Sequence, residues 1–579
     1  MTRLSPATAY RRLVRSGRPW ALVQIVIVLV FSTLAAADFR SINHDCALLL
    51  QAAQLVLEGH RPYVDLFETN PPWIIFLNVP IAWVSRALGL SAALTFVLAV
   101  QLLFAAGALA LSHVLGRLAR RLDQAEAGTL ILGFILANGL IAIRGELGQR
   151  EHLFFLALVP YAFLRLLRHQ GGACHRWVAG SIGLALGLTV LVKPHFFIGP
   201  ILLEIVLVVA HGRRPAPGRP EWIAALAPMG AYALYWLTLP PPVWRAFTDH
   251  AAFMLGGYGA YAKGLGRIVE SLVTYDGYTA VALVLTVTWI ALVARMRFVL
   301  RPIVLVLLAV TVSGLAILLI QSRNYGYHRA PFYGGAAMLL AASLVVARSQ
   351  SRNRRGLGWL RCDMVLVPFG LAVGTAALSL GLVVPAVLRP GPDSPLERIV
   401  KRWSRPGDTV FFIDTSVTPA YPLLLLLDRK PGTRTFYCYP LALIGKLSGR
   451  WSDEDSPRPP DPGALIAREL RYLAELEEDL RRSRPAMVLI RKPPCQACPA
   501  GFDVRDYLRV VGVMSRAVTP LFDRVEDHPL FWVYVRCRIC ERRPLVPHLH
   551  LETVEALLKS LIDAPRKDER CATTSPRTF

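Results

Sequence analysis

The chain has 579 residues, of which 54% are hydrophobic and only 18% are charged. This composition excludes a water-soluble globular protein and predicts a polytopic α-helical membrane protein. The formal net charge of +24 would indicate a nucleic-acid partner in a soluble protein. Here the Lys and Arg residues stand in short connections between apolar runs, where they set membrane orientation, so we expect the lipid bilayer and no nucleic acid as a partner.

The first apolar segment, 20–37, follows a basic N-terminus that contains Arg3, Arg11 and Arg18. A basic start before an apolar run is also the pattern of a signal peptide, and Ala35-Ala36-Ala37 is compatible with cleavage. We prefer an uncleaved first transmembrane helix, because no convincing small-residue cleavage site stands at a usual distance before the polar region that follows. A signal peptide stays the alternative.

The polar stretch after this segment is rich in carboxylates. Asp45 comes first, and Glu58, Asp65 and Glu68 follow in the same loop. A carboxylate at a membrane surface can deprotonate a hydroxyl, and a second can hold a divalent metal ion through its oxygens. We therefore expect the active site in this loop. The alternative is that these carboxylates are solvated or pair locally with arginines such as Arg61.

The apolar run 71–88 is not expected to cross the membrane, unlike the later apolar runs. If it crossed the membrane, every later basic connection would move to the outer side, against the positive-inside rule. We therefore expect a helix that lies at the outer interface or re-enters from it, with Trp73 and Trp83 at headgroup depth. The N-terminus is then inside, and residues 389–579 are outside.

Apolar runs long enough to cross a bilayer, which requires about 20 residues, recur along the first two thirds of the chain. The connections between them alternate in character. Basic connections, such as those near Arg117 and Arg213, are expected on the cytoplasmic side, and connections with carboxylates, aromatics and histidines are expected outside. We predict about eleven spans, near 20–37, 91–114, 128–143, 152–167, 178–194, 197–211, 222–239, 277–294, 302–320, 332–347 and 363–388.

Cationic side chains are expected on the same outer face as the carboxylates. A phosphate at the membrane surface would find charge-assisted donors there, whereas headgroup anchoring and snorkelling are the alternative. The long connection 240–276, with several tyrosines, is either a lid over a lipid substrate or an interfacial aromatic belt. The cations concerned are Arg150, which precedes Glu151 in the second outer connection, Lys193, His195, Arg323, His328 and Arg329.

The last third, from about residue 390, alternates short β-like runs with one amphipathic pattern. The runs are 409–413 and 486–490, and the pattern over 463–482 predicts a charge-rich helix. These features predict a small α/β domain over 389–579. Residues beyond about 564 are expected to be disordered.

Two Cys-x-x-Cys units lie in this region, Cys495 with Cys498 and Cys537 with Cys540. Four thiolates can form one structural zinc site. An oxidising compartment outside the membrane favours disulfides within or between the pairs instead, and a redox function is the third possibility. Under either of the first two interpretations the cysteines are structural.

These elements resemble the GT-C class of integral-membrane glycosyltransferases in their order, in their spacing and in the side of the membrane on which each is expected. The resemblance is particularly to the bacterial relatives of protein mannosyltransferases and of the lipid A aminoarabinose transferase. In that class an acidic residue in the first outer loop is essential, and the resemblance gives this role to Asp45. Glu68-Thr69-Asn70-Pro71-Pro72 is similar to the family's Glu-Lys-Pro-Pro-like element, but Thr69 or Asn70 stands where the family carries lysine. Glu151 resembles its second-loop acidic residue.

Two later features carry the same resemblance, which covers roughly residues 20–350. Lys193 lies where many members have a lysine at the outer end of a span, and Tyr327 to Pro331 is similar to a late Tyr/His-to-Pro segment. The resemblance implies a transmembrane glycosyltransferase domain over 1–388 and a soluble outer α/β domain over 389–579. It also implies a multi-pass location in the bacterial inner membrane.

The resulting hypothesis is transfer of one hexosyl or pentosyl group from a polyprenyl-phosphate-linked donor to an acceptor hydroxyl on a cell-envelope glycan, lipid or protein. A transporter or flippase of a lipid-linked sugar is the alternative, although it predicts ionisable residues near the middle of spans rather than at their outer ends. The hypothesis assigns Asp45 as general base, Glu68, Glu151 and Asp65 to the acceptor or a divalent metal ion, and Lys193, Arg329, His328 and Arg150 to the donor phosphate.

Overall fold

The computed structural model describes residues 39–118, 122–212, 219–260, 264–274, 277–293, 301–323, 325–353, 394–448, 462–495, 498 and 502–537. Its internal contacts divide the chain into two units, which are described separately. The first comprises the described residues of 1–252, 261–394 and 421–427, and the second those of 253–260, 395–420 and 428–579.

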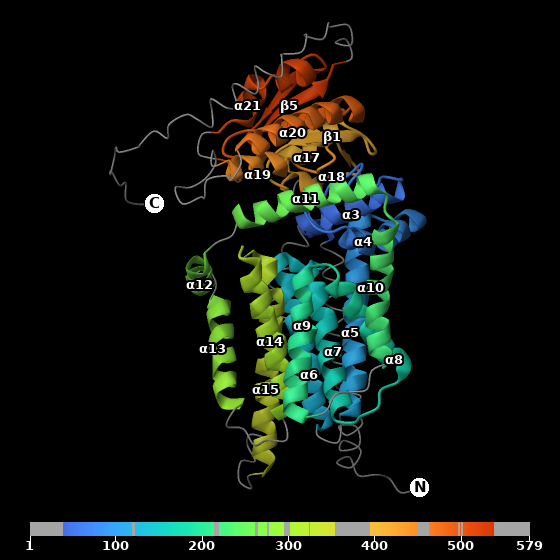
Figure 1. Cartoon of the computed structure of the whole chain (residues 1–579), viewed down its shortest axis with the longest axis vertical. Helices are drawn as coiled ribbons and strands as arrows, with labels where there is room; N and C mark the ends of the chain where they lie inside the picture. Colours follow the sequence, from blue (N-terminus) through green and yellow to red (C-terminus); the bar gives the residue numbers. More distant parts are fainter. Residues whose placement is uncertain are drawn as a thin grey trace, which may run out of the picture. The chain divides into compact units, whose positions relative to one another are not determined.

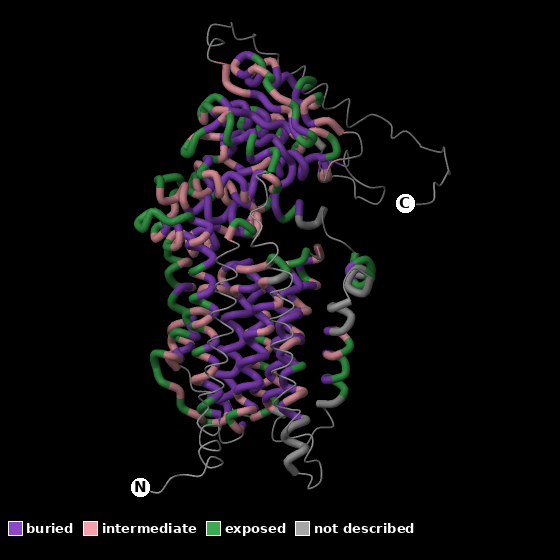
Figure 2. Tube along the Cα trace, turned by 180° about the vertical axis from the view of Figure 1, so that it is seen from behind, coloured by how far each residue is buried: buried purple, intermediate pink, exposed green. Residues whose placement is uncertain are grey.

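The first unit is a helical bundle. Helices α5, α6, α7, α9, α14 and α15 lie side by side in Figure 1, and Figure 2 shows that many of the residues in the middle of the bundle are buried. The elements of this unit are η1 (Phe39–Ser41), α3 (His44–Leu57), α4 (Trp73–Leu88), α5 (Ala92–Arg117), α6 (Gln124–Ile141), η2 (Ala142–Glu146), α7 (Arg150–His169), α8 (Arg176–Val190), η3 (Pro194–Phe197), α9 (Ile198–His211), α10 (Pro220–Thr238), the first part of α11 (Pro241–Ala260), α12 (Leu265–Thr274), α13 (Gly277–Val293), α14 (Arg301–Gln321), η4 (Gly326–Arg329) and α15 (Ala330–Asn353).

Several described helices are long and apolar enough to cross a membrane, so the chain is a multi-pass membrane protein. A further span is present if α10 and α11, which meet at 112°, count as one. The predicted spans 20–37 and 363–388 lie outside the described residues, so the total of about eleven stays a prediction. Among the described residues the five helices that qualify are Ala92–Arg117, Gln124–Ile141, Pro194–His211, Pro302–Gln321 and Gly326–Val346.

The predicted span 152–167 forms α7, which lies inside the bundle. Every residue of α7 except Leu153 is buried. Its neighbours approach closely because they carry glycine at the contact: a Cβ added to Gly334 of α15 would come within 2.5 Å of the Phe155 ring. The helix nevertheless begins with Arg150 and Glu151, so each of its charges needs a partner from another helix.

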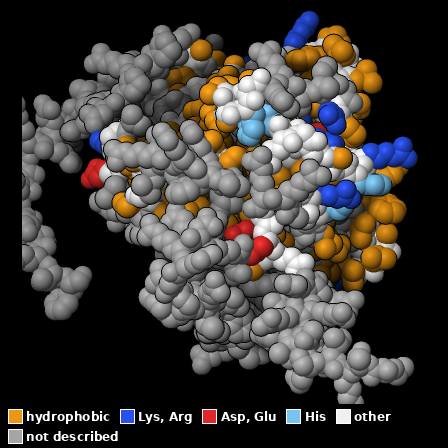
Figure 3. Space-filling view, turned by 90° about the horizontal axis from the view of Figure 1, so that it is seen from below, with side chains coloured by type: hydrophobic (Ala, Val, Ile, Leu, Met, Phe, Trp, Pro, Cys, Tyr) orange, Lys and Arg blue, Asp and Glu red, His pale blue; other side chains and the backbone are white. Residues whose placement is uncertain are grey.

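A buried ion network lies at the other end of α7. Arg165 donates to Glu204 of α9 through Nε (2.5 Å) and Nη2 (3.2 Å), and through Nη1 to Glu221 of α10 (3.1 Å). Arg168 donates through Nε and Nη2 to Glu221 at 3.0 and 3.2 Å. Both arginines are buried between helices. Figure 3 views this lower end of Figure 1, where Lys, Arg and His side chains stand among hydrophobic ones.

The segment expected at the outer interface forms α4, which is too short to qualify as a span by itself. The indole of Trp73 donates to the carbonyl of Leu188 in α8 at 2.8 Å. Trp73 therefore packs against protein rather than standing among headgroups, whereas Trp83 is 60% exposed. The interfacial position of this helix stays a prediction.

The second unit is built on a five-stranded sheet of order β2-β1-β3-β5-β4. β1 runs parallel to β2 and β3, whereas β5 runs antiparallel to β3 and β4. The predicted strands and helix of this region are present as β1, β3 and α20. The elements are α17 (Pro395–Trp403), β1 (Thr409–Ile413), β2 (Lys430–Pro431), α19 (Tyr439–Leu447), α20 (Pro462–Ser483), β3 (Met487–Arg491), α21 (Val504–Val510), η5 (Met514–Val518), β4 (Phe522–His528) and β5 (Phe531–Arg536); α18 (Ala420–Leu426) falls almost entirely in the first unit.

The sheet register separates the two cysteine pairs. Cys495 and Cys498 are joined by a disulfide in the loop after β3. Cys537 directly follows β5, and Cys540 lies outside the described residues. Because Met487 pairs with Val535 and Arg491 with Phe531, the chain leaves β3 and β5 at opposite ends of the sheet. A single zinc site made from both pairs does not fit this register.

Glu221→Ala tests whether the buried ion network stabilises the bundle. Removing one partner of a buried ion pair costs roughly 3–5 kcal/mol, and here two guanidinium groups lose a carboxylate. We expect a clear fall in the thermal unfolding midpoint of the purified protein in detergent. Arg176→Ala, at an exposed position, is the matched control and should leave the midpoint unchanged. Equal midpoints for both variants would contradict a stabilising role.

Candidate functional site

Asp45 lies in the first turn of α3, not in a loop. Its backbone N–H donates to the side chain of Asn43, which caps the helix. The following residues from Cys46 to Ala53 are buried, so apolar packing extends a helix where the acidic pattern predicted an open loop. The loop itself runs from Glu58 to Pro72. The helix start therefore fixes the backbone of Asp45.

The start of α3 is tied to the start of α7. Arg150 donates from Nη2 to Asp45 Oδ2 at 2.8 Å, and Gln149 donates to Asn43 Oδ1 at 2.7 Å. Arg150 is buried, and its guanidinium also lies over the ring of Tyr327 at 5.4 Å. Asp45 keeps part of its side chain exposed. This pair joins the predicted base to a predicted phosphate ligand.

A second buried pair links three elements. Lys193, between α8 and η3, donates to Glu151 Oε1 at 2.5 Å and to Gln321 Oε1 at 2.8 Å. Its ammonium group lies 5.3 Å from the centroid of the Tyr327 ring. Burial lowers the pKa of Lys193 to about 8, although Glu151 acts in the opposite direction. Arg150, Glu151 and Lys193 thus form one cluster.

Several polar atoms of this cluster have no hydrogen-bond partner among the described residues, although they are buried. Lys193, Arg150 and Arg323 act electrostatically on His328, while the carboxylates of Asp45 and Glu151 pair with Arg150 and Lys193. Buried polar groups are normally paired with protein, water or ligand. The cluster therefore has unused hydrogen-bonding capacity for a ligand. The unpartnered atoms are Arg150 Nε, Glu151 Oε2, His195 Nε2, Gln321 Nε2 and His328 Nδ1.

The predicted acceptor carboxylates Glu68 and Asp65 have local partners. Glu68 accepts from the backbone and side chain of Asn70 and from Thr69 Oγ1, and burial raises its pKa. Asp65 accepts from the backbone N–H of Arg61 at 2.9 Å. Both side chains therefore shape the loop in which they lie. Their assignment to an acceptor stays a prediction.

Glu146 is a candidate that the sequence reasoning did not assign. Its Oε2 accepts from Asn43 Nδ2 at 3.4 Å, and burial, together with the charges of Glu151 and Asp45, raises its pKa to about 7. The sequence signal is a carboxylate set between Gly145 and Gly148, which have φ of 77° and 75°. Such conformations favour glycine, and they bring Glu146 back toward α3.

Arg329, the remaining predicted phosphate ligand, is buried at the end of η4, directly before α15. Its Nη1 lies 3.5 Å from the hydroxyl of Tyr333, and Arg144 lies over the same ring at 5.2 Å. His328, by contrast, lies within electrostatic range of Lys193 and Arg150. Arg329 is therefore the cation that this segment contributes.

A divalent metal ion fits this site poorly. The described residues contain no group of three or more His, Cys, Asp or Glu side chains arranged to hold a metal. Oxygens of Asp45, Glu151 and Glu68 already accept from Arg150, Lys193 and Asn70. A divalent metal ion would therefore compete with Arg150, Lys193 and Asn70 for these oxygens.

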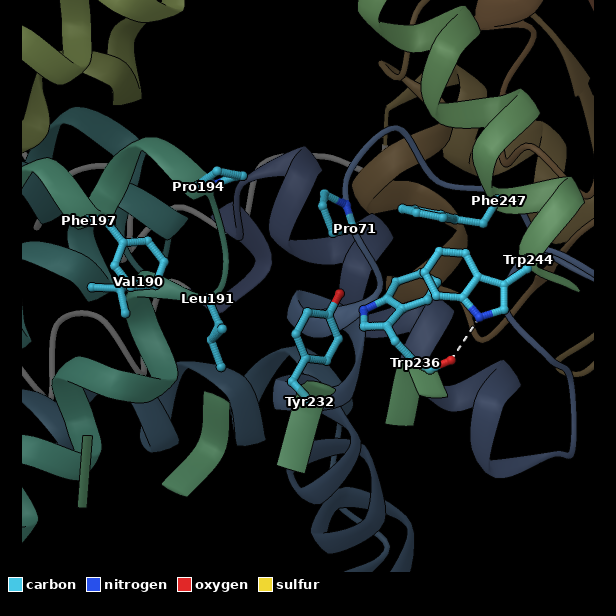
Figure 4. Close-up of a pocket in the computed structure, with 9 residues that line it drawn as sticks. All are labelled: Pro71, Val190, Leu191, Pro194, Phe197, Tyr232, Trp236, Trp244 and Phe247. Atoms are coloured by element: carbon cyan, nitrogen blue, oxygen red, sulfur yellow. Dashed lines mark hydrogen bonds between the residues drawn. The ribbon is translucent and has the colours of Figure 1, made fainter. Parts of the chain in front are cut away.

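An apolar cavity of about 320 Å³ is lined by sequence neighbours of Lys193 (Figure 4). Leu191 and Pro194, which flank Lys193, form one wall, and aromatic side chains of α10 and α11 form the other. Trp244 donates from its indole to the carbonyl of Trp236 at 2.8 Å, which holds the bent helix pair together. From the sequence, the α10 aromatics were expected in a span, and those of α11 in either a lid or an interfacial aromatic belt. The lining residues are Pro71, Val190, Leu191, Pro194, Phe197, Tyr232, Trp236, Trp244 and Phe247.

Comparison with known proteins identifies the fold. No family profile and no curated protein matches this sequence. Among solved structures, the crystal structure of ArnT from Cupriavidus metallidurans bound to undecaprenyl phosphate is similar over 92% of this chain and 99% of that chain, with 13% identity and a TM-score of 0.50. The arabinofuranosyltransferase AftD from Mycobacteria matches at a TM-score of 0.43 and 18% identity, over 82% of this chain and 35% of that chain. The resemblance to the GT-C class is confirmed at the level of the fold.

Proposed function

We propose that the protein transfers a sugar from a polyprenyl-phosphate-linked donor to an acceptor hydroxyl at the outer face of the membrane. The observation that carries this proposal is the buried cluster of Arg150, Lys193 and His328, whose unpartnered atoms adjoin the carboxylates of Asp45 and Glu151. The fold shared with ArnT, which was crystallised with undecaprenyl phosphate, supports a lipid phosphate as the donor.

The phosphate of the donor binds at the cation cluster. Lys193 and Arg150 supply positive charge, and His328 supplies an imidazole with an unpartnered nitrogen. Charge-assisted donors in a buried site stabilise the negative charge that grows on a leaving phosphate. The apolar cavity beside Leu191 and Pro194 receives the start of the polyprenyl chain.

The acceptor binds on the side of the carboxylates. The oxygen of the acceptor hydroxyl attacks the anomeric carbon of the donor sugar, and Asp45 takes the proton of that hydroxyl. The bond from the anomeric carbon to the phosphate oxygen breaks. The phosphate stays on the lipid. Arg150 orients Asp45 through their 2.8 Å contact. Ionised Glu146, which interacts electrostatically with Asp45, accepts a hydrogen bond from the acceptor and holds it in place.

The proposed setting is the bacterial inner membrane, with the cluster and residues 389–579 on the outer side. The acceptor is a cell-envelope glycan, lipid or protein, and the transferred group is a hexosyl or pentosyl unit. Because the donor is activated by its own phosphate, the reaction requires no nucleotide.

Asp45→Asn should abolish sugar transfer because an amide cannot accept the proton. The measurement is donor consumption by purified protein with a panel of polyprenyl-phosphate sugars and native membrane extract. Glu58→Gln, which alters an exposed carboxylate of the same loop, is the matched control and should retain turnover. Full turnover by Asp45→Asn would overturn the base assignment. Movement of the lipid donor across proteoliposomes without transfer would favour a transporter instead.

Lys193→Gln should reduce the rate of transfer by roughly a hundredfold or more, because one charge-assisted donor to the leaving phosphate is lost. The readout is the first-order rate at saturating donor. Arg61→Gln removes an exposed cation of the same face and should have little effect. Equal rates for the two variants would mean that Lys193 does not meet the phosphate.

The rate should depend on pH as a bell-shaped curve. Glu146 has a raised pKa of about 7 and becomes a carboxylate above it, whereas Lys193 has a lowered pKa of about 8 and loses its charge above it. Transfer should therefore rise through about pH 7 and fall through about pH 8. Lys193→Arg should remove the alkaline limb, because a guanidinium stays charged. A flat wild-type profile across this range would contradict both assignments.

A further inference from the structure

A second group of cations in the chain lies far in sequence from the proposed active site. It surrounds Trp532 of β5 in the second unit. Lys492 lies 4.1 Å, Arg505 4.0 Å and Arg524 4.4 Å from the centroid of the indole ring. We name these four residues together with Asp527 the Trp532 cluster.

The sheet register explains why these residues meet. Ile490 of β3 is directly opposite Trp532, and Lys492 follows two residues later, on the same face of the sheet. Asp527 of β4 is the cross-strand partner of Trp532 on the other side. Arg505 comes from the first turn of α21, where the side chain of Asp503 accepts from its backbone N–H. Three separate elements therefore place cations on one aromatic ring.

The cluster holds more positive than negative charge. Asp527 is shared, because it accepts from Lys492 at 3.2 Å and from Arg524 at 2.7 Å. The contact of Arg505 with Asp506 is long, 3.8 Å, and Arg509 holds the same carboxylate oxygen at 3.0 Å. One carboxylate thus serves two of three cations that repel one another, so an added anion would relieve the repulsion.

The cluster also has unused hydrogen-bond donors. The Nε atom of Arg505 and the indole nitrogen of Trp532 are buried and have no partner among the described residues. Lys492 and Arg505 remain partly accessible, with 17% and 19% of their side chains exposed. Fixed cations with free N–H groups at an accessible position match the acceptor oxygens of a phosphate group.

We propose that the Trp532 cluster is a binding site for a phosphate group, distinct from the donor-phosphate site of the first unit and independent of the transferase reaction. The group belongs either to a free phosphate or to a lipid headgroup. Arg505 and Trp532 donate to its oxygens, Lys492 and Arg524 supply charge, and Asp527 competes with the ligand for these cations.

Fluorine NMR of the full-length protein in phosphatidylcholine nanodiscs tests this site directly. The protein is labelled with 5-fluorotryptophan, and the Trp532 signal is assigned with Trp532→Phe. Titration with inorganic phosphate should move that signal saturably, whereas sodium chloride at matched ionic strength should not. Because the readout is Trp532 itself, phosphate bound at the Lys193 cluster does not interfere, and failure here leaves the proposed function untouched.

Three variants make the outcome decisive. Lys492→Gln/Arg505→Gln should weaken phosphate binding by at least about tenfold, since charge-assisted hydrogen bonds are lost. Arg509→Gln, an exposed neighbour, should bind as wild type. Asp527→Asn should bind phosphate more tightly, an effect that loss of structure cannot produce. Unchanged signals of the other tryptophans report that the fold is intact.

Nanodiscs that contain phosphatidic acid distinguish the two sources of phosphate. If a lipid headgroup is the natural occupant, the apparent affinity for inorganic phosphate should fall in these discs, and the Trp532 signal should start near its bound position. If free phosphate is the ligand, the titration should match that in phosphatidylcholine. The proposal is overturned if phosphate never moves the Trp532 signal, or if the double variant binds as wild type.

Discussion

The burial of charge along α7 is the constraint on which the first unit depends. This helix is buried over nearly its whole length, yet it has arginine near both ends and Glu151 at its start. An unpaired charge in such a position is costly, so each must find a partner on another helix. Arg150 pairs with Asp45 of α3, whereas Arg165 reaches Glu204 of α9 and Glu221 of α10. The charges of α7 therefore restrict which helices can pack against it.

The two ends of α7 differ in how their arginines are paired. Arg165 donates from Nε and from both terminal nitrogens, whereas Arg150 Nε has no partner among the described residues. Unpartnered buried atoms occur at both ends, because His169 Nδ1 and Glu151 Oε2 also lack a partner among these residues. What distinguishes the start of α7 is that Arg150 and Lys193 lie there beside the carboxylates of Asp45 and Glu151. The proposed site is placed there for this reason.

The sequence selects candidate residues for the proposed site, but it does not give their arrangement. Asp45, Glu151 and Lys193 could be selected because their order and sides resemble a known class. The contact between Lys193 and Glu151 could not be predicted, because it depends on how three separate elements pack together. Asp45 was expected in a loop because the carboxylates around it suggested exposure, but the buried face of α3 forms a helix. Glu146 was not assigned, although two glycines flank it, because single glycines seldom reveal where a carboxylate points. The cysteine pairs required the antiparallel register of β3 and β5 before a shared zinc site could be set aside.

The position of Lys193 joins the apolar and charged parts of the site. Its neighbours Leu191 and Pro194 face the aromatic cavity, while its ammonium group contacts Glu151 and Gln321. In the proposed reaction, a donor with an apolar chain would place that chain in the cavity and its phosphate at Lys193, whose sequence neighbours line the cavity. A soluble nucleotide sugar has no chain to fill the cavity and would leave its apolar lining facing water. An apolar cavity next to the segment that carries a buried lysine therefore supports the proposal of a lipid-linked donor.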